Sequence, residues 1–275
     1  MTADLTSARI SPEEFDRVLA RYEALIETLS APSRSTGHAK EGALETLAQL
    51  DAWRLKVLPD VVRKREKGNG STWLEKSEVE TLVKWKLKHG KFRPRLLQLA
   101  ESNAPTTVKD TTRNAFARFA SVADPAEALK TLSSLKGVGP ATASLLLSIF
   151  DPTTIPFFSD ECFRWVMYDE PGRGRGWDRK IKYDAREYAD YLTQVQALRT
   201  RLAGEAGRDV SAQDVERVGF VVGKEAEPSI SSLGKRASPA PAQRPVKKSL
   251  ASAESERKKP KTADGTLRRS TRSNR

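Results

Sequence analysis

The chain has 275 residues, of which 38% are hydrophobic, with one cysteine, two histidines and a net charge of +12. A single cysteine excludes disulfides within the chain and cysteine-bound iron–sulfur clusters, and so few sulfur and imidazole ligands argue against zinc, so we expect neither a metal nor another cofactor. No apolar run approaches the roughly 20 residues of a membrane span, and we expect no membrane partner.

The first part of the chain predicts helices only. Ser11 and Ser77 each begin a capping pattern, and apolar residues at helical spacing follow them. Pro59 is expected to end or kink the second helix. The expected helices cover residues 12–29, 43–64, 78–89, 94–100 and 107–122, with a polar loop over residues 33–42.

A basic stretch without acidic residues extends from Leu82 to Arg95 and interleaves two aromatic residues with the cations. It indicates a surface that follows a phosphate backbone beside a stacking Trp85. The alternative is a solvated basic face with Trp85 and Phe92 in the core. Lys84, Lys88 and Lys91 would share one face if the helix continued. The cations are Lys84, Lys86, Lys88, Lys91, Arg93 and Arg95.

Two helices separated by a short glycine turn follow, over residues 125–150. Asp124 begins the capping pattern of the first helix, and Pro140 suits the first position of the second. Gly137 and Gly139 can both adopt positive φ angles and leave their amides uncovered. Exposed amides at a helix N-terminus form an anion site, and on DNA the anion is a backbone phosphate. The alternative is a packing turn within a protein–protein module.

The remaining elements are also helical. Ser159 or Asp160 is expected to cap one helix, Asp184 a long helix to about Leu202, and Ser211 a last short one. No stretch predicts a strand. We therefore predict an all-α domain over residues 1–223.

Residues 224–275 carry 14 basic and 5 acidic residues, a net charge of +9, against +3 for the rest of the chain. This composition, rich in Ser, Pro, Ala, Lys and Arg, predicts disorder. The pairs at 235–236 and 247–248 resemble a bipartite nuclear-localisation signal, and residues 258–261 resemble a monopartite one. We predict a nuclear protein whose basic tail binds a nuclear import receptor.

The hairpin LKGVGPATA (residues 135–143), followed by FSDECFRW (158–165), resembles the core of the helix–hairpin–helix DNA glycosylase superfamily. The resemblance implies a glycosylase-like helical fold that contacts duplex DNA without strong sequence preference and flips a base out of the stack. It implies phosphate contacts at Gly137, Val138, Gly139, Ala141 and Thr142. The basic stretch adds candidate DNA contacts at Lys84, Lys88, Lys91, Arg93 and Arg95, with Trp85 as a secondary candidate.

The same resemblance places Asp160 in the base pocket, where the family's aspartate stabilises an oxocarbenium-like sugar or activates water. Arg164 matches an arginine common in that segment and is a secondary candidate. Family members that also cut the backbone carry a lysine where this chain has Ala141, so Schiff-base chemistry is not expected from that position. The competing explanation for Asp160 is helix capping alone.

Three functions remain open from the sequence. The first is a nuclear DNA-binding protein on this fold without enzymatic activity, and the second is an active monofunctional glycosylase of base excision repair that uses Asp160. The region around Trp85 also resembles a segment of eukaryotic nuclear proteins, some labelled as histone-acetyltransferase complex components. The third function is therefore a non-catalytic subunit with chromatin-complex proteins as partners.

Overall fold

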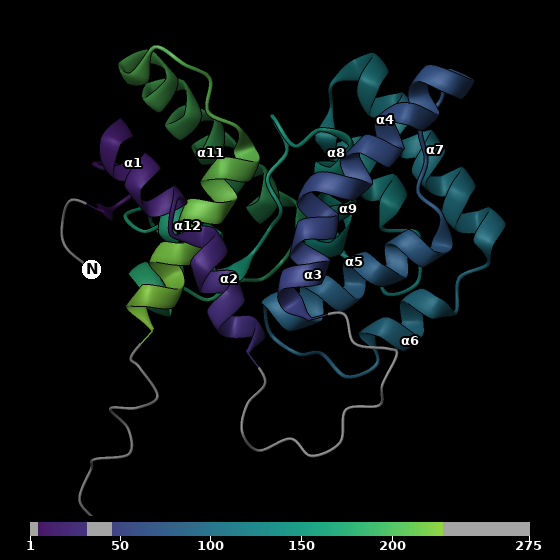
Figure 1. Cartoon of the computed structure of the whole chain (residues 1–275), viewed down its shortest axis with the longest axis horizontal. Helices are drawn as coiled ribbons and strands as arrows, with labels where there is room; N and C mark the ends of the chain where they lie inside the picture. The colour runs from purple at the N-terminus through teal and green to yellow at the C-terminus, as the bar shows by residue number, and fades with distance from the viewer. Residues whose placement is uncertain (1–4, 32–45, 228–275) are drawn as a thin grey trace, which may run out of the picture. The chain divides into compact units, whose positions relative to one another are not determined.

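The computed structural model describes residues 5–31 and 46–227, and within these ranges the chain is helical without any strand (Figure 1). This confirms the all-α prediction. None of the described helices combines the length and the apolar character that a membrane crossing requires. The elements are α1 (Pro12–Leu19), α2 (Tyr22–Ser30), α3 (Leu47–Ala52), a wide π-type turn η2 (Trp53–Val57), α4 (Leu58–Asn69), α5 (Lys76–His89), α6 (Leu96–Glu101), α7 (Pro105–Val122), α8 (Pro125–Leu132), α9 (Pro140–Phe150), α10 (Asp160–Val166), a 3₁₀ turn η3 (Gly176–Asp178), α11 (Ala185–Ala206) and α12 (Ala212–Ala226).

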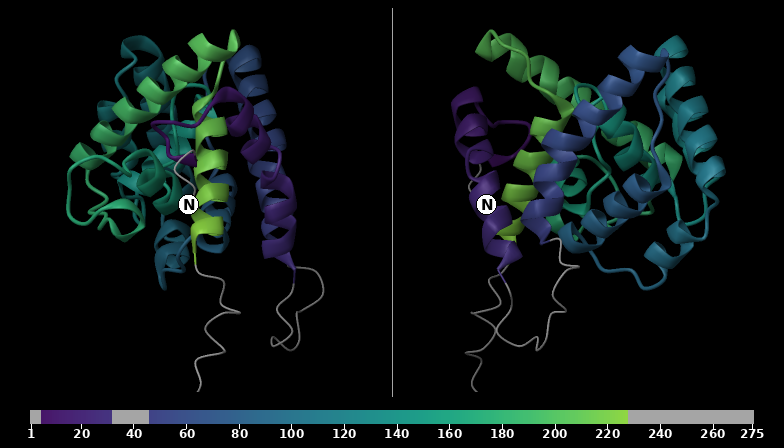
Figure 2. Two further views of the ribbon diagram at one scale, coloured as in Figure 1. Left: turned by 90° about the vertical axis from the view of Figure 1, so that its left-hand side faces the viewer. Right: turned by 45° about the vertical axis from the view of Figure 1, so that its right-hand side comes forward.

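The first predicted helix is in fact two helices. Ser11 caps α1 as expected, with its Oγ accepting a hydrogen bond from the amide of Glu14 at 3.3 Å. The helical path then breaks at Ala20–Arg21, before α2. The break lets α1 pack against α11 and α12 while α2 packs against α3 and α12. Both views of Figure 2 show α12 beside α2.

Pro59 does not end the next helix. Helical backbone continues from Leu47 to Asn69, and the wide turn η2 comes just before the proline. Proline has no amide to donate and its ring crowds the carbonyl four residues earlier, so a wider turn accommodates it. Residues 32–45, which include the predicted polar loop, lie outside the described part of the chain.

The wide turn also aims Arg54 into the core. Its guanidinium makes two 2.7 Å hydrogen bonds to the carboxylate of Glu216 on α12, and both side chains are buried. The same guanidinium lies 4.0 Å from the ring centroid of Trp85 on α5. A buried ion pair of this kind links the N-terminal helices to α12.

Helix α5 begins earlier than the sequence predicts. Glu75, not Ser77, is the N-cap residue, and the carboxylate of Glu78 accepts a 2.8 Å hydrogen bond from the amide of Glu75. The helix ends at His89, as predicted. Serine is a more common N-cap residue than glutamate, so the sequence pattern favoured Ser77, two residues later.

The hairpin helices agree closely with the prediction. Asp124 caps α8, accepting a 2.9 Å hydrogen bond from the amide of Ala126. Helix α9 begins at Pro140 and is buried from Thr142 to Ile149, where it packs against α4, α5 and α8. The hairpin turn therefore projects from a fixed central helix.

Helices α10 and α12 pack at very short range because α12 carries two glycines on the shared face. A Cβ atom on Gly219 would lie 2.7 Å from Cα of Cys162, and one on Gly223 would lie 2.6 Å from Cβ of Glu161. Helix α12 extends to Ala226, three residues beyond the predicted limit of the domain. Residues 228–275, with both nuclear-localisation-like clusters, lie outside the described residues.

Candidate nucleic-acid interface

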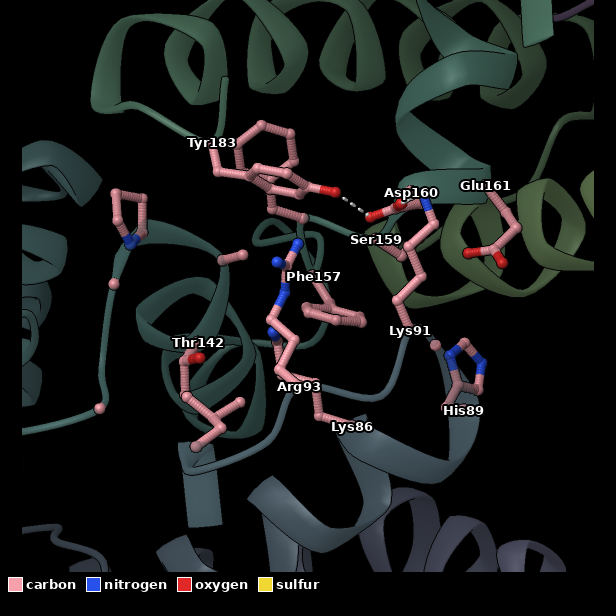
Figure 3. A pocket seen from close by; sticks show the side chains of 17 residues that line it. Lys86, His89, Lys91, Arg93, Thr142, Phe157, Ser159, Asp160, Glu161 and Tyr183 are labelled. Atoms are coloured by element: carbon pink, nitrogen blue, oxygen red, sulfur yellow. Dashed lines mark hydrogen bonds and ion pairs between the residues drawn. The ribbon is translucent and has the colours of Figure 1, made fainter. Parts of the chain in front are cut away.

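A cavity of about 380 Å³ opens where the hairpin turn, the C-terminal end of α5 and the first turn of α10 meet (Figure 3). This volume falls in the range of small-molecule sites. Four of the predicted hairpin residues line it, together with Asp160 of α10. A larger, mainly apolar hollow of about 1100 Å³ between α7, α9 and α11 contains none of the predicted site residues. The hairpin residues in the cavity wall are Gly137, Gly139, Ala141 and Thr142.

The two glycines of the hairpin have different roles. Gly137 has a φ of +79°, and a Cβ atom there would lie 2.9 Å from Cβ of Leu99 on α6. Gly139 has a φ of −95° and a ψ of −178°, so the expectation of a positive φ is wrong for this residue. Gly139 is the N-cap of α9, a position that requires extended backbone. Of the two hairpin glycines, only Gly137 has a backbone conformation that favours glycine.

Asn103, which follows α6, holds the hairpin turn in place through its side chain. Its side-chain amide donates a 2.9 Å hydrogen bond to the carbonyl of Lys136 and accepts one of 2.9 Å from the Lys136 amide. This paired contact imitates a backbone ladder and holds the turn against α6. Asn103 is not among the residues predicted from the sequence, because an asparagine in a turn is usually explained by the turn itself.

The turn presents free amides to the cavity. Within the described part of the chain, the amides of Gly139 and Ala141 have no hydrogen-bond acceptor. Gly139 lines the cavity, and no atom lies within 4 Å of a Cβ placed on it. Val138 does not share this role: its side chain is buried in the core and its amide donates to the carbonyl of Leu135. The geometry is that of an anion site at a helix N-terminus.

The connection between α9 and α10 is extended and is held by hydroxyl groups. Ser144 of α9 accepts a 3.0 Å hydrogen bond from the amide of Phe158, and Tyr191 of α11 donates to the carbonyl of Phe157 at 3.2 Å. Ser159 then caps α10, accepting from the amide of Cys162 at 3.2 Å. The carboxylate of Asp160 is therefore not used as a helix cap, and it is free to face the cavity.

Asp160 is held as an anion. Its Oδ1 accepts a 2.6 Å hydrogen bond from the hydroxyl of Tyr183, and its Oδ2 lies 3.3 Å from Nζ of Lys91 and 3.5 Å from a guanidinium nitrogen of Arg164. Burial opposes ionisation, but the tyrosine hydrogen bond and the charges of Arg164 and Lys91 outweigh it and lower the pKa of Asp160. The carboxylate is thus charged at neutral pH.

Tyr183 is a residue of the site that no sequence pattern predicted. It lies in the segment before α11 with a φ of +59°, a conformation that is strained for a residue with a side chain. Its ring lies 5.8 Å from that of Phe158 and 5.3 Å from the guanidinium of Arg93, measured between centres. A non-glycine residue keeps a positive φ only where the surrounding structure holds it there. Such residues are concentrated at functional sites.

The basic stretch divides between the cavity and the outer surface. Lys86, Lys91 and Arg93 line the cavity, whereas Lys84, Lys88 and Arg95 do not. The expected shared face of Lys84, Lys88 and Lys91 does not form, because α5 ends at His89, before Lys91 is reached. The side chain of Lys91 is instead directed at Asp160.

The two aromatic residues of this stretch have opposite positions. Trp85 is fully buried and donates a 2.9 Å hydrogen bond from Nε1 to Asp51, so it is a core residue and not a stacking surface. Phe92, which the alternative interpretation placed in the core with it, is 74% exposed. Phe157 and Phe158 border the cavity, but their side chains are buried as well.

Arg164 and Glu161 lie near Asp160 on α10, and each makes a contact with a different segment. Arg164 donates from Nε to the carbonyl of Arg179 at 3.1 Å and acts on Asp160 through charge, outside the cavity wall. The carboxylate of Glu161 pairs with Lys224 of α12 at 2.9 Å. Glu161 also lines the cavity, so the carboxylates of Asp160 and Glu161 both lie at its wall, each paired with a cation.

Across the residues that the structure describes, no group of three or more His, Cys, Asp or Glu side chains could hold a metal ion. Cys162 is buried, and burial raises the pKa of its thiol well above the ordinary value.

No family model, curated protein or solved structure matches this chain.

Proposed function

We propose that this chain is a nuclear protein that binds duplex DNA through its helix–hairpin–helix turn and receives one extruded nucleotide in the adjoining cavity. The observation that carries the proposal is the cavity itself, which joins two unpaired backbone amides to an ionised carboxylate. A backbone phosphate suits the amides of Gly139 and Ala141. The glycosylase-like fold and the nuclear location belong to the same proposal, and the location rests on the basic clusters of residues 224–275.

Charge and shape around the cavity support a nucleotide ligand. Lys86, Lys91 and Arg93 bring three cations to its wall, and cations beside a helix N-terminus favour an anionic backbone. The half-buried ring of Tyr183 gives a flat surface on which a base can lie. The volume of about 380 Å³ accommodates a base and its sugar.

A substitution at Gly139 tests the phosphate contact without unfolding the turn. Aspartate is a favoured N-cap, so in Gly139→Asp the new carboxylate accepts from the first amides of α9 and occupies the anion site itself. We expect unchanged or slightly higher stability and at least a tenfold loss of affinity for duplex DNA, measured by fluorescence anisotropy at low salt. Gly139→Ala, which adds no charge and has open space for its Cβ, serves as the matched control. Wild-type affinity in Gly139→Asp would overturn the phosphate contact.

A second candidate function is base removal by a monofunctional glycosylase, and the ionised state of Asp160 favours it. A carboxylate with a lowered pKa is a weak base, so its suitable role is to stabilise positive charge on the sugar as the base departs, while water supplies the oxygen at C1′. Incubation with duplexes that carry damaged or mismatched bases should release a free base. Asp160→Asn should abolish that release while duplex binding persists. An inactive wild-type protein over a broad set of lesions would leave binding as the function.

A further inference from the structure

Thr142 brings a hydroxyl group without a partner to the cavity wall. The residue lies in the first turn of α9, lines the cavity and is only 3% exposed. Within the described part of the chain its hydroxyl makes no hydrogen bond, yet the hydroxyl is not one of the unpartnered atoms that the protein encloses fully. The small exposed part of Thr142 therefore includes its hydroxyl, which faces the cavity. A buried hydroxyl without a partner costs free energy, and a ligand that accepted its proton would remove that cost.

Lys86 and Arg93 bring two positive charges to the same cavity. Among the residues that the structure describes, neither forms an ion pair or a hydrogen bond, although the guanidinium of Arg93 lies 5.3 Å from the ring centroid of Tyr183. Burial, and then the positive charge of Arg93, lowers the pKa of Lys86 to about 8, against the weaker opposing effect of Asp160. The two cations therefore repel each other and share no counter-ion.

The carboxylates at the cavity wall do not compensate these two charges, because each is already paired. Asp160 lies 3.3 Å from Nζ of Lys91, and Glu161 lies 2.9 Å from Nζ of Lys224. The pairs cancel, and the two cations without an acidic partner give the wall an excess of positive charge. Such an excess in a cavity of this size is suited to a doubly charged anion.

We propose that this cavity binds a phosphate monoester, the group at the broken or terminal end of a DNA strand, through Lys86, Arg93 and the hydroxyl of Thr142. The free amides of Gly139 and Ala141, in the first turn of α9, complete the donor set. This inference rests on the proposed function, because the hairpin is the part of the protein that brings duplex DNA to the cavity.

Charge and the number of donors favour a monoester over the phosphodiester of an intact strand. A monoester carries about 1.5 to 2 negative charges at pH 7, which matches the two uncompensated cations. Each phosphodiester of an intact strand carries only one. A monoester also offers three terminal oxygen atoms to the donors, whereas a diester offers two. A diester must further leave the cavity with its chain on both sides, whereas a strand end leaves on one side only.

The cavity also has room for the nucleotide that carries the phosphate. Figure 3 shows Thr142 and Asp160 on opposite sides of the cavity, with Arg93 between them. A phosphate bound on the Thr142 side lets the sugar and base extend toward Asp160 and Tyr183. The volume of about 380 Å³ suits one end nucleotide.

Duplexes that differ only at a break in one strand test the proposal with the full-length chain. One duplex is intact, and the others carry a nick with a 5′-phosphate, with a 3′-phosphate or with hydroxyl groups alone. By fluorescence anisotropy we expect at least about tenfold tighter binding to one of the phosphate-bearing nicks than to the hydroxyl nick. Nucleoside monophosphates and unphosphorylated nucleosides, titrated without DNA, distinguish a strand end from a free nucleotide as the source of the phosphate.

Each outcome decides between the two proposals. A wild type that binds all duplexes equally overturns this inference alone. Binding of the free monophosphate in preference to the nucleoside, without binding to any duplex, overturns the strand end as the source and the proposed function with it. A protein that binds neither duplex DNA nor the monophosphate overturns both proposals.

Two variants assign the preference to the cavity. Thr142→Val removes the hydroxyl at nearly constant volume, and Lys86→Gln removes the charge; each should lower the preference for the phosphate-bearing nick about tenfold. Thr142→Ser keeps the hydroxyl and should keep the preference. Lys88→Gln, an exposed position on the same helix outside the cavity, is the matched control and should behave as the wild type does.

The preference is a ratio of two affinities of the same variant, so a loss of folded protein lowers both affinities together. Circular dichroism reports whether each variant is folded. A full preference in both Thr142→Val and Lys86→Gln would overturn the assignment of the phosphate to this cavity.

Discussion

The hydroxyl of Tyr183 donates a 2.6 Å hydrogen bond to Oδ1 of Asp160, across 23 positions of sequence. The tyrosine makes this contact from a backbone with a φ of +59°. Burial and the hydrogen bond to Asp160 raise the pKa of the Tyr183 hydroxyl, so it remains a donor at neutral pH. The pair couples the segment before α11 to the first residue of α10 and keeps the carboxylate oriented toward the cavity.

Replacing Tyr183 with phenylalanine should raise the pKa of Asp160 and destabilise the fold. The pKa of Asp160 is lowered on folding, so its contribution to stability is present above the unfolded value near pH 4 and is lost as pH falls through the folded value. We expect the free energy of unfolding in urea to fall by about 1–2 kcal/mol at pH 7, and the difference to shrink near pH 3. Tyr168→Phe, whose hydroxyl has no partner within the described chain, should show neither effect.

Glu216→Gln should cost about 3–5 kcal/mol of stability, because it leaves the buried guanidinium of Arg54 without a charge partner. Urea denaturation measures the loss. The double variant Arg54→Met with Glu216→Leu removes both charges and should lose less than the single variant does. Glu127→Gln breaks only exposed pairs and should change stability by less than about 1 kcal/mol. Equal losses in the exposed and the buried variant would contradict the role assigned to the buried pair.

The hairpin glycines should respond differently to alanine. Gly137→Ala places a Cβ at 2.9 Å from Leu99 in a left-handed conformation, and we expect a loss of about 1–3 kcal/mol. Gly139→Ala meets no atom and keeps an allowed φ, so its stability should stay within about 1 kcal/mol of the wild type. Thermal unfolding of the two variants side by side distinguishes them. A destabilised Gly139→Ala would mean that the extended backbone at this cap tolerates only glycine.

Arg93→Gln should weaken duplex binding and make it less sensitive to salt. Each phosphate that a cation neutralises contributes about 0.9 to the slope of log affinity against log salt, so removing one such cation lowers the slope by that amount. Anisotropy titrations at several salt concentrations give the slope. Arg118 on α7 is exposed and lies outside the cavity, so Arg118→Gln is the control with an unchanged slope. An unchanged slope in Arg93→Gln would remove this residue from the DNA surface.

Labelling of Lys86 by propanal, an aldehyde that reacts with neutral amines, should follow a pH profile with its midpoint near 8. The charged and titratable groups around the cavity are His89, Lys91, Arg93, Asp160, Glu161 and Tyr183. Arg93→Gln removes a cation and should move the midpoint upward. Asp160→Asn removes an anion and should move it downward. Peptide mass spectrometry at each pH reports the labelling of Lys86, and a midpoint near the ordinary lysine value of about 10.4 would show that Lys86 is an ordinary surface amine.

Local sequence signals predicted most of the elements. Ser11, Asp124, Asp184 and Ser211 cap the helices that they were expected to cap, because capping depends only on residues within one turn. Helix α9 begins and ends at the predicted residues. The break between α1 and α2 was not predictable in this way, because it is set by the separate surfaces on which the two helices pack.

The candidate site was predictable only where local sequence patterns mark its residues. The hairpin and Asp160 carry recognisable patterns, and the structure places them around one cavity. Lys86 cannot be distinguished from Lys84 or Lys88 by pattern, because only the tertiary structure places it in the cavity wall. Tyr183 lies in an irregular segment where no periodicity marks it, and its contact with Asp160 depends on long-range packing.

The two glycines of α12 give the end of the folded region control over the chemistry of the cavity. Because Gly219 and Gly223 let α12 lie against the first turn of α10, even one added methyl group there would push α10 away. Asp160 would then move relative to Tyr183 and Lys91, although neither glycine touches the cavity. The close packing of α12 on α10 thus sets the position of the Asp160 carboxylate. A partner that displaced or bent α12 would change the distances from Asp160 to Tyr183 and Lys91.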